Sequence, residues 1–164
     1  MQVRVRRMEA GEEKLFLELK KGVLYPFLSK EAMEEWIKGE GVAAPLCFVL
    51  VDKNEGDKII GGLVLEIQDF LGNQEILLQL DIFFVLPEYR RKGWGTELLC
   101  KSLFLAGEFY SKENLRVSGL LVQTTGLNKG AANFYRNFCR FFSYCQMTQK
   151  MGTREVTIFL ISLR

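Results

Sequence analysis

Apolar and polar residues alternate along several stretches of the chain and repeat with helical spacing along others. Alternating or continuous apolar runs bounded by Gly, Pro and Asn predict strands. Such runs lie at 2–8, 47–51, 59–67, 74–85, 117–124, 143–148 and 156–163. Helical spacing occurs over 9–21, from Ser29 past Trp36, over 94–110 and over 129–139. This order predicts a mixed α/β sheet of six to seven strands with helices on both faces.

Size and composition predict a single domain over residues 1–164. A chain of 164 residues folds without disulfides or metals, and an apolar fraction of 48% argues against disorder. The net charge of +2 gives no general attraction to nucleic acid or to an acidic membrane. The longest apolar run, near 76–86, is broken by Gln79 and Asp81, and the N-terminus has no signal-peptide pattern. We therefore expect a soluble, cytoplasmic protein that binds neither nucleic acid nor membrane.

The chain contains no histidine, which excludes Ser-His-Asp and Cys-His catalysis and imidazole-dependent metal sites. Its four cysteines match no zinc-binding spacing and are expected to be free thiols in a reducing cytosol. Proton transfer must then depend on carboxylates, Tyr, Cys, Lys or water. No metal is expected.

A basic, glycine-containing turn joins the strand at 74–85 to the helix at 94–110. Gly93 and Gly95 let the backbone approach a ligand closely. The first amides of the helix favour an anion, and Arg90, Arg91 and Lys92 add positive charge at the same place. The turn therefore predicts a pyrophosphate site.

Two other phosphate-binding motifs do not fit this turn. Gly95-Thr96-Glu97 lacks the Lys-Ser/Thr pair of a Walker A loop. A Rossmann fingerprint has a third glycine near position 98, where this chain has Leu98.

A second motif runs from Asn128 to Tyr135. These two residues lie on one helical face, about 10 Å apart. Taken alone, Asn128 is expected to cap the helix and Tyr135 to pack in the core. With the turn, the segment resembles the Asn-x-x-Ala-x-x-Phe/Leu-Tyr block of the GCN5-related N-acetyltransferase (GNAT) superfamily. The superfamily's acetyl-CoA signature, Arg/Gln-x-x-Gly-x-Gly/Ala, is matched by Arg90, Gly93 and Gly95.

The resemblance implies a mostly antiparallel central sheet whose strands separate at an acetyl-CoA site. It implies that the backbone of Phe83, Phe84 and Val85 pairs with the pantetheine arm of acetyl-CoA, the acyl donor. The implied pyrophosphate ligands are the turn amides of Arg91, Lys92, Gly93, Trp94, Gly95 and Thr96. Asn128 is implied to contact the arm, and Tyr135 to face the sulfur.

The implied reaction transfers the acetyl group to a primary amine by direct attack in a ternary complex. The Val85 N–H is the implied oxyanion donor, and Tyr135 fits the acid that protonates the leaving thiolate. An amine with a pKa of about 10.4 is protonated at neutral pH, so a base is useful.

The sequence offers several candidates for the residue that accepts the amine proton. Our first choice is Asp81, which shares a face with the other odd-numbered residues from 77 to 85 on a strand without a bulge. Pairing with a cation or a backbone amide is the structural alternative for Asp81. Gln79 and Glu66 are weaker candidates for the base, and water alone is the remaining alternative. Some superfamily members carry a Glu five residues before the Asn, where this chain has Gln123. A β-bulge would change which residue faces the site.

Tyr25 and Phe27 are candidate substrate contacts, because superfamily members bind the acceptor between the early helices and the central strands. Ordinary packing of these rings over the sheet is the alternative. The acceptor itself, small molecule, peptide or protein, stays open. A homodimer formed through the strand at 156–163, as an exposed edge, is one expectation. A GNAT-fold module that binds CoA without turnover is the main functional alternative, and a nucleotide-binding module is another.

Overall fold

The computed structural model describes residues 2–19, 30–125, 128–151 and 154–163. Its elements are β1 (Val3–Arg7), α1 (Glu13–Leu19), α2 (Lys30–Ile37), β2 (Leu46–Asp52), β3 (Lys58–Gly72), β4 (Glu75–Val85), α3 (Trp94–Lys112), β5 (Arg116–Thr125), α4 (Lys129–Cys139), β6 (Tyr144–Met151) and β7 (Arg154–Ser162). Short 3₁₀ turns cover Lys53–Glu55 and Pro87–Tyr89. The strands form a 7-stranded sheet in the order β1-β2-β3-β4-β5-β7-β6. Only the β4–β5 pair is parallel, so the predicted mixed, mostly antiparallel sheet is confirmed.

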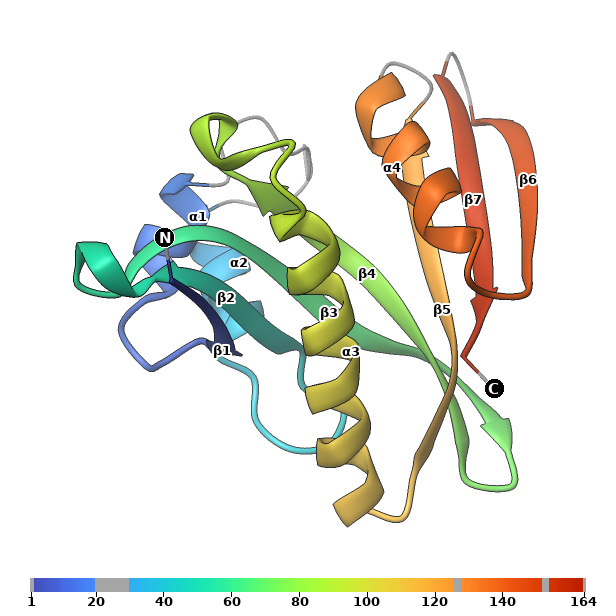
Figure 1. Ribbon diagram of the computed structural model, residues 1–164. Helices are drawn as coiled ribbons and strands as arrows, with labels where there is room; N and C mark the ends of the chain where they lie inside the picture. Colours follow the sequence, from blue (N-terminus) through green and yellow to red (C-terminus); the bar gives the residue numbers. More distant parts are fainter. Residues whose placement is uncertain (1, 20–29, 126–127, 152–153, 164) are drawn as a thin grey trace.

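The sheet has an apolar core on each face. In β2, Phe48 and Leu50 belong to the core beneath α3, whereas Cys47 and Val49 belong to the core beneath α1 and α2. Both sets are buried, which explains why β2 is continuously apolar rather than alternating. α3 and α4 lie in front of the sheet in Figure 1, and α1 and α2 lie behind it.

The parallel pair β4–β5 is joined by α3, the crossover that a parallel connection requires. Pairing between these two strands ends at Leu80 and Val122, although β4 continues to Val85. Beyond that point β5 still pairs with β7 but no longer with β4, and β4 and β5 diverge toward the top of Figure 1. The separation of strands that the resemblance implied is therefore present.

A β-bulge interrupts β4 at Asp81. In the register with β3, Leu65 pairs with Leu80 and Val64 with Ile82, which leaves Asp81 as the extra residue. The bulge reverses the faces of the strand, because Leu80 packs in the α3 core and Ile82 in the α1–α2 core. The odd-numbered residues from 77 to 85 therefore do not share one face; the structure has the bulge that was the alternative.

Two further expectations change. The helix predicted over 9–21 begins only at Glu13, because Gly11 has a φ of 95° and the Glu12 carboxylate accepts the Glu9 N–H at 2.8 Å. The strand predicted at 156–163 is not an edge, because β7 lies between β5 and β6. The exposed edge on that side of the sheet is β6.

α1 packs against the sheet through the fully buried ring of Phe16, which lies directly over Gly62 of β3. A Cβ at Gly62 would lie 2.2 Å from Phe16 Cε2. We expect Gly62→Ala to displace this ring and to lower the free energy of unfolding by about 1–3 kcal/mol in urea titrations. Gly107→Ala is the control, since nothing lies within 4 Å of its Cβ position, and it should be neutral or slightly stabilising. Equal stability of the two variants would contradict this packing.

Candidate active site

The basic turn leads into α3 without a side-chain cap on the first backbone N–H groups of the helix. Gly93 is the N-cap with a φ of 83°, a left-handed conformation that favours glycine, and no side chain caps the helix there. Arg91 is also left-handed, with a φ of 60°. The first amides of a 19-residue helix are thus left to a ligand or to solvent, as an anion site requires.

The three basic side chains of the turn differ in their contacts. Arg90 Nε donates to the Val85 carbonyl oxygen at 2.7 Å, which ties the turn to the end of β4. Lys92 Nζ donates to the Glu88 carbonyl oxygen at 3.1 Å, yet its side chain stays exposed, like that of Arg91. Arg90 therefore has a structural role in addition to its charge.

An aromatic group lies beside the turn, where β4 and β5 have separated. The ring of Phe83 stacks on Phe134 of α4 at 5.1 Å and lies 6.1 Å from Tyr135. A Cβ at Gly95 would lie 3.4 Å from both Phe83 and Phe134. The structure therefore brings together Gly95, Phe83 and Tyr135, three of the residues predicted for the site.

Tyr135 is 5% exposed and lies in the core that α3 and α4 share. Burial raises the pKa of the Tyr135 phenol well above its ordinary value. The phenol is therefore a neutral proton donor at physiological pH, the form that an acid needs.

Asn128 caps α4, as expected from its position. Its Oδ1 accepts the Ala131 N–H at 3.0 Å, and its own N–H donates to the Thr125 carbonyl oxygen at 2.9 Å. The contact with a coenzyme arm that the resemblance implied stays a prediction.

A cluster of polar side chains lies on the opposite face of the sheet, toward α2. We call it the acidic cluster; it consists of Glu66 of β3 with Gln79 and Asp81 of β4. Glu66 and Gln79 are direct cross-strand partners, and Gln79 Nε2 donates to Asp81 Oδ1 at 2.5 Å. Glu66 is hydrogen-bonded to Asp81 and accepts a hydrogen bond from the Trp36 side chain.

The environment of the acidic cluster raises the pKa of Glu66 to about 7. Burial is the largest cause, followed by the negative charge of Asp81 and by the hydrogen bond to it, whereas the Trp36 hydrogen bond acts in the opposite direction. Glu66 therefore changes charge near neutral pH, where a general base is most effective. The sequence signal was an acidic residue inside an apolar strand, the same signal that indicated Asp81.

The remaining predicted residues are distributed around these groups. Phe84 packs in the α1–α2 core and contacts Phe16 edge to face at 5.3 Å, and Val85 is 8% exposed. Gln123 is exposed on β5 opposite Ile158. Tyr25 and Phe27 lie outside the described residues.

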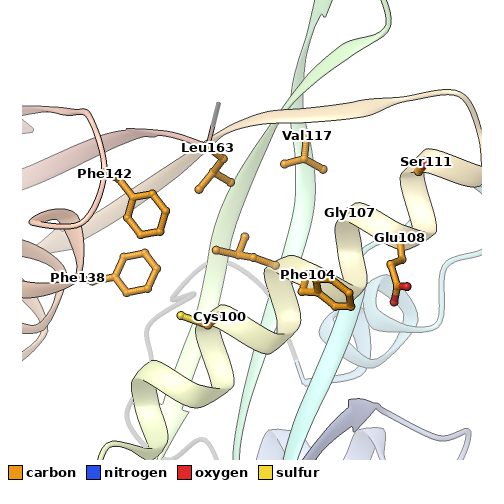
Figure 2. A pocket seen from close by; sticks show the side chains of 10 residues that line it. Cys100, Phe104, Gly107, Glu108, Ser111, Val117, Phe138, Phe142 and Leu163 are labelled. Atoms are coloured by element: carbon orange, nitrogen blue, oxygen red, sulfur yellow. The ribbon is translucent and has the colours of Figure 1, made fainter.

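A cavity of about 510 Å³ lies away from this site, along α3 and the C-terminal end of α4. Cys100, Phe104, Phe138, Phe142 and Leu163 are among the residues that line it. Figure 2 shows these side chains around the hollow. None of the predicted site residues that the structure describes lines it.

Within the described part of the chain, no group of three or more Cys, Asp and Glu side chains is placed to hold a metal ion. Across the described residues, no helix combines the length and the apolar character needed to span a membrane. The four cysteines are free thiols, of which Cys47 and Cys139 are buried.

Comparison with known proteins defines the class. A model of the acetyltransferase (GNAT) family matches residues 13–141, and the chain therefore belongs to this family. No curated protein matches the chain.

Among solved structures, the chain is similar to Arabidopsis thaliana NAA60 in complex with a bisubstrate analogue (TM-score 0.72, 12% identity, 98% of each chain covered). It is also similar to the NatC complex bound to Gag peptide and CoA (TM-score 0.71, 16% identity, 100% of each chain). A third is a spermidine N-acetyltransferase SpeG chimera from Vibrio cholerae and hSSAT (TM-score 0.67, 20% identity, 99% of this chain and 96% of that one). These likenesses show the fold.

The raised pKa of Glu66 predicts a pH dependence of stability. Folding favours the protonated carboxyl, so this contribution is complete below the ordinary pKa of 4.5 and is lost as pH rises to about 7. In urea unfolding, Glu66→Gln should gain stability relative to the wild type as pH rises through this window. Glu108→Gln, at an exposed position of α3, is the control and should follow the wild type. Parallel pH profiles for wild type and Glu66→Gln would be inconsistent with the raised pKa.

Proposed function

We propose that this chain transfers the acetyl group of acetyl-CoA to a primary amine by direct attack in a ternary complex. The observation that carries the proposal is the arrangement where β4 and β5 separate. The uncapped N-terminus of α3 and the Tyr135 phenol belong to one face, and the acidic cluster belongs to the other. Acetyl transfer to an amine needs an anion site for the coenzyme, a proton donor for the thiolate and a proton acceptor for the amine.

In this proposal the amides of residues 91–96 bind the pyrophosphate of acetyl-CoA. The backbone of residues 83–85 pairs with the pantetheine arm along the edge of β4 that β5 has left, and Asn128 contacts the arm from the start of α4. Structures of the same fold with acetyl-CoA, in Arabidopsis thaliana NAA60, and with CoA, in the NatC complex, support this coenzyme.

The chemical step is an attack of the amine nitrogen on the thioester carbonyl carbon. The Val85 N–H donates to the oxyanion that forms, and the carbon–sulfur bond then breaks. Tyr135 protonates the departing thiolate. The acceptor is a small molecule, a peptide or a protein; similar structures include an enzyme named for spermidine and a complex with a peptide.

Calorimetry and a thiol-release assay test the function together. We expect acetyl-CoA and CoA to bind at least about tenfold more tightly than ATP, because ATP has no pantetheine arm for β4. We expect CoA release from acetyl-CoA in the presence of at least one amine from a panel of polyamines, aminoglycosides, amino acids and peptides. Binding of CoA without release by any amine would favour a non-catalytic module, and equal affinity for ATP would favour a nucleotide-binding module.

Tyr135→Phe tests the acid. We expect kcat to fall by about 10²-fold or more, because the thiolate then leaves without a proton donor. The acetyl-CoA affinity should change little, because the phenylalanine ring keeps the aromatic packing. Tyr110→Phe is a matched control: Tyr110 is fully buried in the same core and its hydroxyl has no hydrogen-bond partner in the described chain. Proportional losses of kcat and affinity in Tyr135→Phe would make Tyr135 a packing residue.

A further inference from the structure

Two carboxyl groups from neighbouring strands meet on the α1–α2 face of the sheet. Glu66 stands directly opposite Gln79 in the antiparallel β3–β4 register, and the next polar residue of β4, Asp81, is within hydrogen-bond distance of Gln79. Gln79 donates to Asp81, and Asp81 is hydrogen-bonded to Glu66. The three side chains form one connected chain of hydrogen bonds in the order Gln79, Asp81, Glu66.

The two carboxyls are not equivalent. The amide N–H of Gln79 donates to Asp81, whereas the indole N–H of Trp36 donates to Glu66. A hydrogen bond between two carboxyls needs one proton; Glu66 holds it below pH about 7 and is a carboxylate, able to accept a proton, above that pH. The raised pKa of Glu66 agrees with this, because burial, the negative charge of Asp81 and the hydrogen bond to Asp81 all favour the protonated form of Glu66.

The carboxyl pair lies next to the point where β4 and β5 separate. Asp81 is the first residue of β4 beyond the last pair with β5, and Glu66 is on the strand next to it. Tyr135 belongs to the core on the other face, which α3 and α4 cover. A thioester lying between β4 and β5 therefore has a proton donor on one side and a carboxyl pair on the other.

On the basis of the proposed function, we propose that Glu66, rather than Asp81, accepts the proton of the attacking amine. Asp81 is then a positioning residue: its charge and its hydrogen bond keep Glu66 basic and fix its orientation. This assignment replaces Asp81 as our first choice for the base.

Acetylation of an ammonium ion releases one proton overall. The acceptor arrives as an ammonium ion, and one proton passes from its nitrogen to the Glu66 carboxylate, which then donates to Asp81. The neutral nitrogen forms the bond to the carbonyl carbon, and the carbon–sulfur bond breaks. Tyr135 gives its proton to the thiolate, the nitrogen loses its second proton to water, and water reprotonates the Tyr135 phenolate. Glu66 returns its proton to water, so one proton is released per acetyl group transferred.

The charged and titratable groups that act on Glu66 come from several elements. Asp81 of β4 raises its pKa, and Trp36 of α2 lowers it by donating a hydrogen bond. Tyr110 of α3 is affected in return: burial raises the pKa of Tyr110 to about 12, Arg7 acts in the opposite direction, and the negative charge of Glu66 adds a smaller increase. Among the described groups, Asp81 is the one whose removal most changes the proton affinity of Glu66.

The test is the pH profile of kcat/KM for an amine acceptor found in the thiol-release panel. The wild type should lose activity below pH about 7. Glu66→Gln should lower kcat/KM by about 10²-fold or more and remove this acidic limb, because no group remains to take the proton. Asp81→Asn should keep the limb but move it to lower pH by about one pH unit, because a like charge has been removed. Both variants should bind acetyl-CoA like the wild type in calorimetry.

The carboxyl resonances of ¹³C-labelled protein give a readout that does not depend on turnover. A glutamate resonance that titrates near pH 7 should be absent in Glu66→Gln and should titrate at lower pH in Asp81→Asn. Loss of the limb in Asp81→Asn with a wild-type profile in Glu66→Gln would overturn the assignment and make Asp81 the acceptor. If the resonance titrates as expected but no amine is acetylated, the proposed function fails instead, and the catalytic role of Glu66 fails with it.

Discussion

The parallel hydrogen bonding between β4 and β5 ends at Leu80 and Val122, and the candidate site exists because it ends there. β3 continues to pair with β4 as far as Val85, so one edge of the opening is fixed. β7 pairs with β5 through Gln123–Thr125, which fixes the other edge. Backbone groups without partners are costly to bury, so such an opening favours a ligand with amide groups of its own. A pantetheine arm has this chemistry.

The bulge at Asp81 determines which side chains of β4 face each side of the sheet near the opening. Before it, the even-numbered residues of β4 pack beneath α3; after it, Ile82 and Phe84 pack beneath α1 and α2. Phe83 is thereby turned toward α4, where it stacks on Phe134. Without the bulge Phe83 would lie on the α1–α2 face, and the aromatic group around Tyr135 would lose the member that comes from β4.

The sequence predicted those parts of the site that depend on local conformation. The turn before α3 and the cap of α4 were predicted because Gly93 and Asn128 act on their own neighbours in the chain. Local patterns did not reveal the pairing of Glu66 with Gln79 or the extra residue at Asp81, since register depends on how two strands pack together. The start of the first helix was misplaced for a similar reason: the Glu12 carboxylate holds Arg6 of β1, with Nη2–Oε1 at 2.7 Å.

The proposed reaction needs a proton acceptor near neutral pH, and in a chain with no histidine another group must have this property. An isolated glutamate is too weak a base, because it holds its proton only below about pH 4.3. Two properties of the acidic cluster change this: partial burial disfavours the charged form, and the neighbouring Asp81 makes a second negative charge costly. In the proposed mechanism, the cross-strand carboxyl pair takes the place of an imidazole. The β4–β5 pairing ends at Leu80 and the next residue is Asp81, so the opening of the sheet and the carboxyl that raises the pKa of Glu66 lie at the same point of β4.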